Sequence, residues 1–274
     1  MKLETLRLEV ADHVATVTLD RPDALNAMNA AFWTDMIEVF EAIARDGSVR
    51  AVLLASTGKH FTAGLDLKWA AEDGLADRDA ETARMREAFR RKVKRMQETF
   101  SVIDRCRVPV IAVVQGGCIG GGVDLVTACD IRIGTADCFF TIQEINVGIV
   151  ADVGTLQRIP YLLPQGLVRE LAYTGRRFMA DEALRFGFLN SAHNGHDAAI
   201  EAGQAMAREI AGKSPMAVAG VKQVLNHGRG RTIEDGLEYV AVWNAAMLFG
   251  EDMEAAIKAQ MTRQPAVFRD LKAG

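Results

Sequence analysis

Hydrophobic and polar residues follow strand-like and helix-like patterns in turn along the first half of the chain. Strict alternation predicts two strands, at 6–10 and 14–19, with a turn at 11–13 between them. Nearly uninterrupted apolar runs at 49–56 and 108–115 are typical of strands that are buried on both faces. The first half of the chain is therefore expected to build a sheet.

Segments with helical periodicity separate and follow these strands. Residues 30–44 form an amphipathic pattern behind Asn29, a good helix cap, and residues 85–106 form a longer helix that is basic on one side. Segment 68–84 is polar and acid-rich, so we expect a loop or a short helix there. The remaining pattern predicts short strands at 131–133 and 139–142, and helices at 153–163, 165–173, 180–187, 196–212, 215–227, 232–248 and 251–262.

The change from a mixed pattern to a helical one divides the chain into two parts. We expect residues 1–200 to form an α/β core and residues 201–274 to form a helical region. That helical region would cover the core or pair with another subunit. No internal repeat or low-complexity linker interrupts the sequence.

Composition narrows the classes of function. The 274 residues carry a formal net charge of -4, which argues against nucleic acid as the main partner because nucleic-acid binding leaves a basic surface. No run approaches the roughly 18 apolar residues of a membrane span, and the N-terminus lacks the apolar block of a signal peptide. The cysteines lack CxxC spacing, which predicts reduced thiols in a cytoplasmic protein without a metal site: Cys106, Cys118, Cys129 and Cys138.

Several familiar catalytic motifs fail on their spacing. The Gly212-Lys213-Ser214 run resembles the end of a P-loop, but alanine stands at 207, where the first glycine is required. The glycine cluster at 116–122 does not follow GxGxxG, so a dinucleotide site is disfavoured. The five histidines form no HExxH pair, and no GxSxG elbow is present.

Three carboxylates stand out in and after the glycine cluster. Asp124 follows GGGV at a predicted helix start, Glu144 comes just past a strand, and Asp152 lies among apolar neighbours. Acids in apolar segments tend to have raised pKa values, which suits proton transfer near neutral pH. A purely structural role, as helix caps, remains open for Asp124 and Asp152.

Two glycine-containing turns add main-chain donors. The turn FTAGLDL at 61–67 ends the strand that begins near 49, and the glycines at 120–122 end the strand that begins near 108. Free N–H groups at such turns are able to converge on one oxygen as an oxyanion hole. Their convergence here is a hypothesis.

Four segments resemble the crotonase (enoyl-CoA hydratase/isomerase) superfamily: LDRPDALNAMN at 19–29, KHFTAGLDL at 59–67, VPVIAVVQGGCIGGGVDLVTACDIRI at 108–133 and RQPAVF at 263–268. The resemblance spans nearly the whole chain. It implies an α/β spiral of ββα units, with C-terminal helices that form trimers and trimers that pair into hexamers. It also implies an acyl-CoA substrate in the core, with coenzyme A as part of the substrate and no separate cofactor or metal.

Within this family the chain is similar to the Δ3,5-Δ2,4-dienoyl-CoA isomerases. The segments 32–40 and 146–160 carry the likeness, together with the spacing of the acids: 144 − 124 = 20 and 152 − 144 = 8. The likeness implies isomerisation of 3,5-dienoyl-CoA to 2,4-dienoyl-CoA in fatty acid β-oxidation. Ordinary hydratases resemble this scheme with glutamates at the first two positions and no third acid.

The resemblance implies a role for each site residue. Asp152 would be the base at C2 and Glu144 the acid at C6, although the two roles could be exchanged, with Asp124 assisting. The N–H groups of Leu65 and Gly121 would form the oxyanion hole.

Coenzyme A would lie against Ala63 and Gly64 with Lys59 near its phosphates, and Arg21 and Phe268 are weaker candidates. The alternatives are a 2-enoyl-CoA hydratase, which does not require the third acid, and a non-catalytic binding module.

Overall fold

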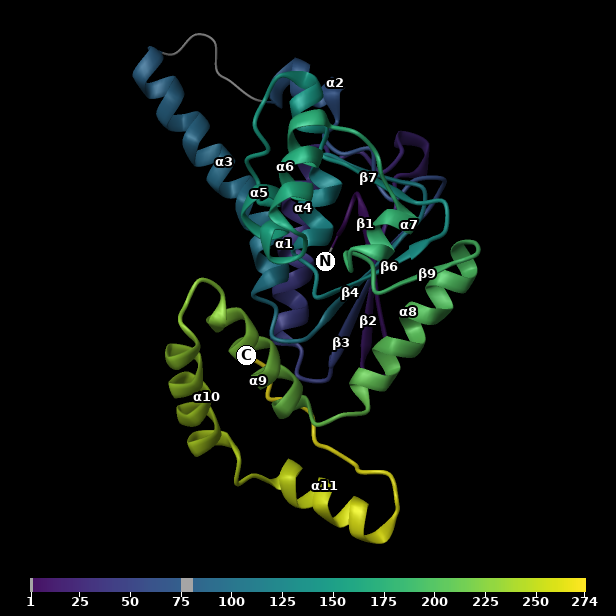
Figure 1. The fold of residues 1–274 in the computed structure, drawn as a ribbon, viewed down its shortest axis with the longest axis vertical. Helices are drawn as coiled ribbons and strands as arrows, with labels where there is room; N and C mark the ends of the chain where they lie inside the picture. The colour runs from purple at the N-terminus through teal and green to yellow at the C-terminus, as the bar shows by residue number, and fades with distance from the viewer. Residues whose placement is uncertain (1, 75–80) are drawn as a thin grey trace.

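The computed structural model describes residues 2–74 and 81–274. Its core is a six-stranded sheet in the order β1-β2-β3-β4-β6-β9, in which the β1–β2 pair is antiparallel and the other pairs are parallel (Figure 1). The strands are β1 (Leu6–Ala11), β2 (Val14–Leu19), β3 (Ala51–Ser56), β4 (Val110–Val114), β6 (Ile131–Thr135) and β9 (Ser191–His193). A second sheet pairs β5 (Gly117–Ile119), β7 (Phe139–Thr141) and β8 (Phe178–Met179).

The predicted hairpin and buried strands are confirmed. Asp12 and His13 form the two-residue turn between β1 and β2, with φ values of 50° and 64°, as a turn that matches strand twist requires. All six residues of β3 and all five of β4 are buried. These two neighbouring strands therefore form the centre of the core.

Helices cover both faces of the large sheet. The helices α1 (Ala30–Arg45) and α3 (Thr82–Asp104) pack together on one face, and α8 (His196–Ala211) lies on the other. Asn29 caps α1 as predicted, because its side chain accepts a hydrogen bond from Phe32 N at 3.2 Å. On α8, a Cβ at Gly203 would lie 2.6 Å from the Val113 side chain, so this helix approaches the sheet closely.

The shorter elements depart from the pattern-based predictions. The sequence did not predict β5, β8 and β9, because two or three residues are too few to show a period and their pairing is set by distant strands. The helix predicted at 153–163 is α5 (Thr155–Arg158) followed by the 3₁₀ turn η4 (Ile159–Tyr161), which contains Pro160, a residue without an N–H donor. Of segment 68–84, residues 75–80 lie outside the described residues.

The other helices complete the fold: η1 (Pro22–Ala24), α2 (Leu67–Trp69), η2 (Ala70–Gly74), α4 (Gly121–Thr127), η3 (Gln143–Val147), α6 (Gln165–Thr174), α7 (Ala180–Arg185), α9 (Pro215–Gly228), α10 (Ile233–Met247) and α11 (Glu251–Thr262). None of the described helices is both long and apolar enough to cross a membrane. The four cysteines are buried and free.

The last helices form an arm that extends away from the core (Figure 1). Neither α10 nor α11 buries any of its residues within the chain. The chain then returns to the core, where Arg50 binds the Asp270 carboxylate at 2.8 Å and the Phe268 carbonyl at 2.8 Å. The expected division at residue 200 lies inside α8, which packs on the core sheet; the division stays a prediction.

Candidate active site

The two glycine-containing turns lie against each other. Thr62 N donates to Gly117 O at 3.2 Å, and Ile119 N donates to Thr62 O at 3.1 Å. Gly64 adopts a φ of +82°, and a Cβ there would lie 2.5 Å from Ile119 O and 3.5 Å from Gly121 N. Only glycine fits this position, and its absence of a side chain lets the backbone of the first turn approach the Gly121 N–H.

The N–H groups of Leu65 and Gly121 donate no hydrogen bond to any other described residue. Both belong to the adjoining turns, and Met28 lies between them: Met28 N donates to Gly64 O at 2.8 Å, and its sulfur lies 2.8 Å from where a Cβ of Gly121 would be. Met28 is fully buried. The structure thus holds two unused donors in neighbouring turns, as an oxyanion hole requires.

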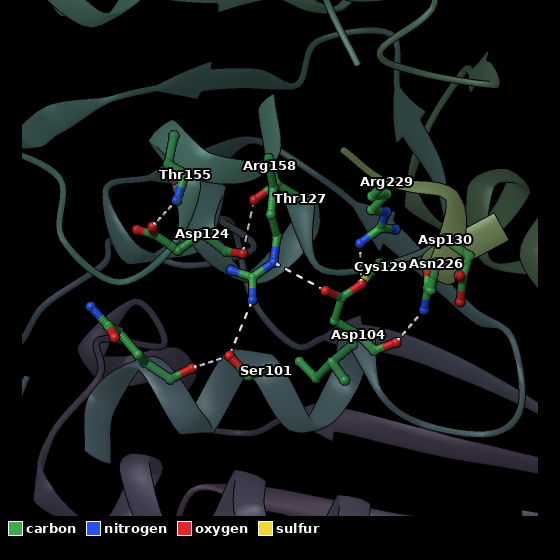
Figure 2. A network of polar contacts seen from close by, with 12 residues as sticks. Ser101, Asp104, Asp124, Thr127, Cys129, Asp130, Thr155, Arg158, Asn226 and Arg229 are labelled. Carbon is green, nitrogen blue, oxygen red and sulfur yellow. Dashed lines mark hydrogen bonds and ion pairs between the residues drawn. The ribbon is translucent and has the colours of Figure 1, made fainter. Parts of the chain in front are cut away.

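Asp124 is fully buried on α4. Its Oδ1 accepts a hydrogen bond from Thr155 N, the first residue of α5, at 2.5 Å (Figure 2). Its Oδ2 has no hydrogen-bond partner among the described residues. Burial raises the pKa of Asp124 to about 6, against the lowering effect of the contact with Thr155 and the charge of Arg158. The carboxylate therefore supports α5 and still titrates near neutral pH.

Glu144 lies in the first turn of η3, directly after β7. Its Oε1 lies 3.2 Å from where a Cβ of Gly120 would be, which places the carboxylate beside the glycine turn. Its Oε2 is buried without a partner in the described part of the chain. Burial, and then the charges of Asp124 and Asp152, raise the pKa of Glu144 to about 7.

Asp152 is exposed in the single chain, although its sequence neighbours are apolar. The segment before it faces outward, since Ile149 is 51% and Val150 73% exposed, and only the flanking Ala151 and Val153 turn inward. Partial burial still raises the pKa of the Asp152 carboxyl. Its carbonyl accepts a hydrogen bond from Gln97 Nε2 at 2.7 Å, which fixes the backbone of Asp152 on α3.

The three acids form one electrostatic cluster. The charges of Asp124 and Asp152 each raise the pKa of Glu144, and the charge of Asp152 raises that of Asp124. With one carboxyl near 7 and another near 6, the cluster holds a protonated acid beside an ionised one close to neutral pH. The arrangement is able to remove one proton and deliver another.

Comparison with known proteins identifies the family. Residues 9–270 match the family described as "Enoyl-CoA hydratase/isomerase". The chain belongs to this family. It is 48% identical over 258 residues to the mitochondrial Delta(3,5)-Delta(2,4)-dienoyl-CoA isomerase of Homo sapiens, covering 93% of this chain and 79% of the relative. It is 39% identical to the peroxisomal Delta(3,5)-Delta(2,4)-dienoyl-CoA isomerase of Arabidopsis thaliana, covering 98% and 97%.

Solved structures confirm the predicted crotonase fold. The enoyl-CoA hydratase of Bacillus anthracis superimposes with a TM-score of 0.87 at 26% identity, covering 97% of this chain and 99% of that one. The enoyl-CoA hydratase of Mycobacterium smegmatis superimposes with a TM-score of 0.85 at 28% identity, covering 96% and 98%. The chain is therefore an enzyme of the enoyl-CoA hydratase/isomerase family with the α/β crotonase architecture.

The residues expected to bind coenzyme A do not all lie near the first glycine-containing turn. Gly64 is buried in the turn, and the half-buried Ala63 uses its N–H on Leu25 O at 2.9 Å. Lys59 is exposed just before the turn. Phe268 is bound through its carbonyl to Arg50 at the amino end of β3, whereas the turn follows the carboxyl end, so Phe268 of the same chain does not join the site.

Arg21 is the last of the expected CoA candidates. Its Nη1 contacts Asp66 at 3.4 Å and the carbonyl of Ala27. These contacts hold the guanidinium against the first turn and the segment that precedes α1. Arg21 therefore has a structural role beside the site that the sequence did not predict.

The sequence did not predict the roles of Gln97, Thr155 and Arg158 beside the acids, or of Met28 beside the two glycine-containing turns. Their contacts join segments far apart in the chain, and no local motif marks them. A cavity of about 970 Å³, lined in part by Gln97 and Arg158, lies between α3, α5 and α9. It reaches Val153, Gly154 and Arg158 but none of the three acids, so it adjoins the acid cluster and does not contain it.

Proposed function

We propose that the protein isomerises 3,5-dienoyl-CoA to 2,4-dienoyl-CoA. The observation that carries this function is the acid cluster, in which Asp152 adds a third carboxylate to the coupled pair Asp124 and Glu144. A hydration needs two acids around one water, whereas a shift of two double bonds needs a base at C2 and an acid at C6. The names of the relatives, which are dienoyl-CoA isomerases at 48% and 39% identity, support the same function.

The two free N–H groups of Leu65 and Gly121 would receive the thioester oxygen. Removal of a C2 proton makes a dienolate, whose charge accumulates on this oxygen. Preorganised donors stabilise that charge, and one such donor contributes roughly 3–4 kcal/mol. Because both donors are main-chain groups, the shape of the Gly64 turn, rather than a side chain, determines their position.

One acid removes a proton from the substrate and a second acid donates one. Asp152 takes the proton from C2, and the electron pair of that C–H bond forms the C1–C2 double bond of the enolate while the carbonyl pair moves onto the thioester oxygen. When the carbonyl re-forms, the C1–C2 pair becomes the C2–C3 double bond. The C3–C4 pair moves to C4–C5, and the C5–C6 pair takes a proton from Glu144 at C6. This assignment is supported by the pKa of about 7 at Glu144, which leaves that group a proton to give near neutral pH.

Coenzyme A would lie along the turn of Ala63 and Gly64, with Lys59 near its phosphates. Four large apolar side chains are exposed between Glu144 and Asp152, and such a strip suits the acyl chain: Ile145, Val147, Ile149 and Val150. The substrate would thus run from the exposed lysine, past the free N–H groups, to the acids.

The arm provides the surface for a homotrimer or homohexamer. Helices α9 to α11 and the link between the last two expose large apolar side chains: Val221, Leu225, Ile233, Leu237, Val242, Met247, Leu248, Phe249, Ile257 and Met261. Exposed apolar area of this kind marks an interface between subunits. Sedimentation equilibrium tests the assembly, and a monomer at micromolar concentration would contradict it.

The family implies a role in acyl-CoA β-oxidation, and we propose that this protein acts in the cytoplasm with its four cysteines reduced. The named relatives are mitochondrial or peroxisomal. Fractionation of source cells with an antibody to the protein decides between these compartments.

The test is a spectroscopic assay with a 3,5-dienoyl-CoA. Formation of the conjugated 2,4-dienoyl thioester raises its ultraviolet band, and Glu144→Gln should slow this rise by roughly 10²–10⁴-fold because the acid at C6 is lost. Asp152→Asn should slow both the band and the exchange of the C2 hydrogen with deuterated solvent. Native exchange in Asp152→Asn would show that the base and acid roles are exchanged.

A 2-enoyl-CoA serves as the control substrate. Loss of the 2-enoyl band without any 2,4-dienoyl product would make the protein a hydratase and overturn the isomerase proposal. Binding of both thioesters without turnover would make it a binding module.

A further inference from the structure

One face of α3 holds the segment that carries Asp152 and the Thr155 N–H that binds Asp124. Gln97, Ser101 and Asp104 recur at the spacing of one helix face. Gln97 binds the carbonyl of Asp152, while Ser101 Oγ accepts a hydrogen bond from Arg158 Nη2 at 3.2 Å. Asp104 lies 3.7 Å from Arg158 Nε (Figure 2). A single helix face therefore fixes both ends of the segment 152–158.

Arg158 is the last residue of α5, and its side chain is 14% exposed. A Cβ at Gly154 would lie 1.8 Å from Arg158 Nη1, so the guanidinium packs directly on the α-carbon of Gly154. Gly154 adopts a φ of +137° and precedes Thr155, whose N–H binds Asp124. The guanidinium thus lies against the turn that presents this N–H to the acid.

We propose that Arg158 is a positioning residue for the acid cluster: clamped on α3 by Ser101 and Asp104, it fixes the Gly154–Thr155 turn on Asp124 and supplies positive charge beside that carboxylate. The inference adds a residue to the proposed function. Only the kinetic test of this inference depends on that function. Neither Arg158 nor its α3 partners need contact the substrate.

A cation near Asp124 is needed because the surroundings of this carboxyl disfavour its ionised form. Glu144 faces it from η3, Asp152 from the loop before α5, and the buried Cys118 thiol from β5. Burial and the negative charge of Asp152 favour the protonated form of Asp124. The positive charge of Arg158 opposes them and lowers the pKa of Asp124. Without it, Asp124 would keep its proton to a higher pH and could not assist Glu144 as an ionised partner.

The clamp also reaches the arm. The second oxygen of Asp104 binds Arg229 Nη1 at 2.6 Å, and the Asp104 carbonyl accepts a hydrogen bond from Asn226 Nδ2 at 2.8 Å (Figure 2). Both partners come from the end of α9 or just after it. Arg229 therefore shares Asp104 with Arg158 but lies outside the contact with Gly154. Its replacement changes the net charge by the same amount and leaves the clamp on the turn in place.

The test compares Arg158→Met with Arg229→Gln in the full chain. Aspartate labelled with ¹³C at the carboxyl reports the titration of Asp124, whose resonance is identified by its loss in Asp124→Asn. Arg158→Met should raise the midpoint of this titration by roughly one pH unit or more, the effect of removing an opposite charge at close range. Arg229→Gln should leave the midpoint unchanged, and Arg158→Lys should keep it close to that of the native protein.

Kinetics on 3,5-dienoyl-CoA give the second readout. Arg158→Met should lower kcat by about 10–100-fold through misplacement of the acids, with KM little changed. Equal midpoints in Arg158→Met and Arg229→Gln would overturn the proposal. If Arg158→Met does not fold, Ser101→Ala and Arg158→Lys are measured in its place. Both should lower kcat, because each weakens the contact between Arg158 and α3. A native kcat in both variants would overturn the proposal. Because the titration uses no substrate, it decides the role of Arg158 even if the native protein fails to isomerise dienes.

Discussion

Replacement of Asp124 by asparagine should change the pH dependence of folding stability. Asparagine keeps an oxygen to accept the Thr155 N–H but carries no titrating proton. Burial raises the pKa of Asp124 from 3.8 to about 6 in the folded protein. The folded state therefore holds a proton that the unfolded chain has released over this interval, so the native protein loses stability as pH rises from about 4 to above 6.

The size of this loss follows from the pKa change. A difference of roughly two pH units at 1.36 kcal/mol per unit corresponds to about 3 kcal/mol. Asp124→Asn abolishes this loss. The difference in unfolding free energy between variant and native protein should therefore shift by about 3 kcal/mol in favour of the variant between pH 4 and pH 7.5.

Urea unfolding at a series of pH values measures this difference. Protomer concentration must be held fixed, because assembly also contributes to stability, and the urea slope should be the same for both proteins. Asp12→Asn is the matched control, since Asp12 is exposed in a turn with a φ of 50° that asparagine adopts easily. A difference that stays flat across this pH interval, or that favours the native protein at high pH, would refute the account of a buried, proton-holding Asp124.

Two further substitutions test the turns and the attachment of the arm. Gly64→Ala should lower kcat/KM on the 3,5-dienoyl-CoA by about 100-fold or more, because its Cβ would meet Ile119 O at 2.5 Å and separate the two N–H donors; Gly166→Ala, which meets nothing within 4 Å, is the control. Lys222→Met should lower the free energy of unfolding by about 3–5 kcal/mol, because the 6%-exposed Lys222 ammonium binds Asp130 at 2.7 Å and its loss strands that carboxylate. Urea unfolding checks the second prediction, and a loss no larger than that of the exposed Lys213→Met would contradict it.

The sequence predicts well the elements that are determined by residues adjacent in the chain. The hairpin turn at Asp12 and His13, the cap at Asn29 and the buried runs of β3 and β4 each depend on neighbouring residues. The glycines of the two turns and the three acids were also recognisable, because special backbone angles and charges in apolar segments leave a mark in the sequence. Their chemistry could be proposed before their arrangement was seen.

The features that the sequence does not predict arise from contacts between distant segments. Arg158 and Asp104 lie 54 residues apart, and nothing near either residue indicates that they pair. The exposure of Asp152 likewise depends on how the segment 145–150 leaves the core, which an apolar pattern cannot distinguish from burial. The two-residue strand β8 follows from its pairing with β7 rather than from its own composition.

The return of the chain to Arg50 has a consequence for synthesis on the ribosome. Arg50 and Asp270 are separated by 220 residues, yet their contact completes the amino end of β3. During translation the buried guanidinium of Arg50 has no carboxylate partner at Asp270 until 220 further residues have been synthesised. The arm stays tethered at one end only during that interval, so nascent chains should join other subunits only after residue 270 is released. A ribosome stalled before that point should hold a core that proteases open near β3.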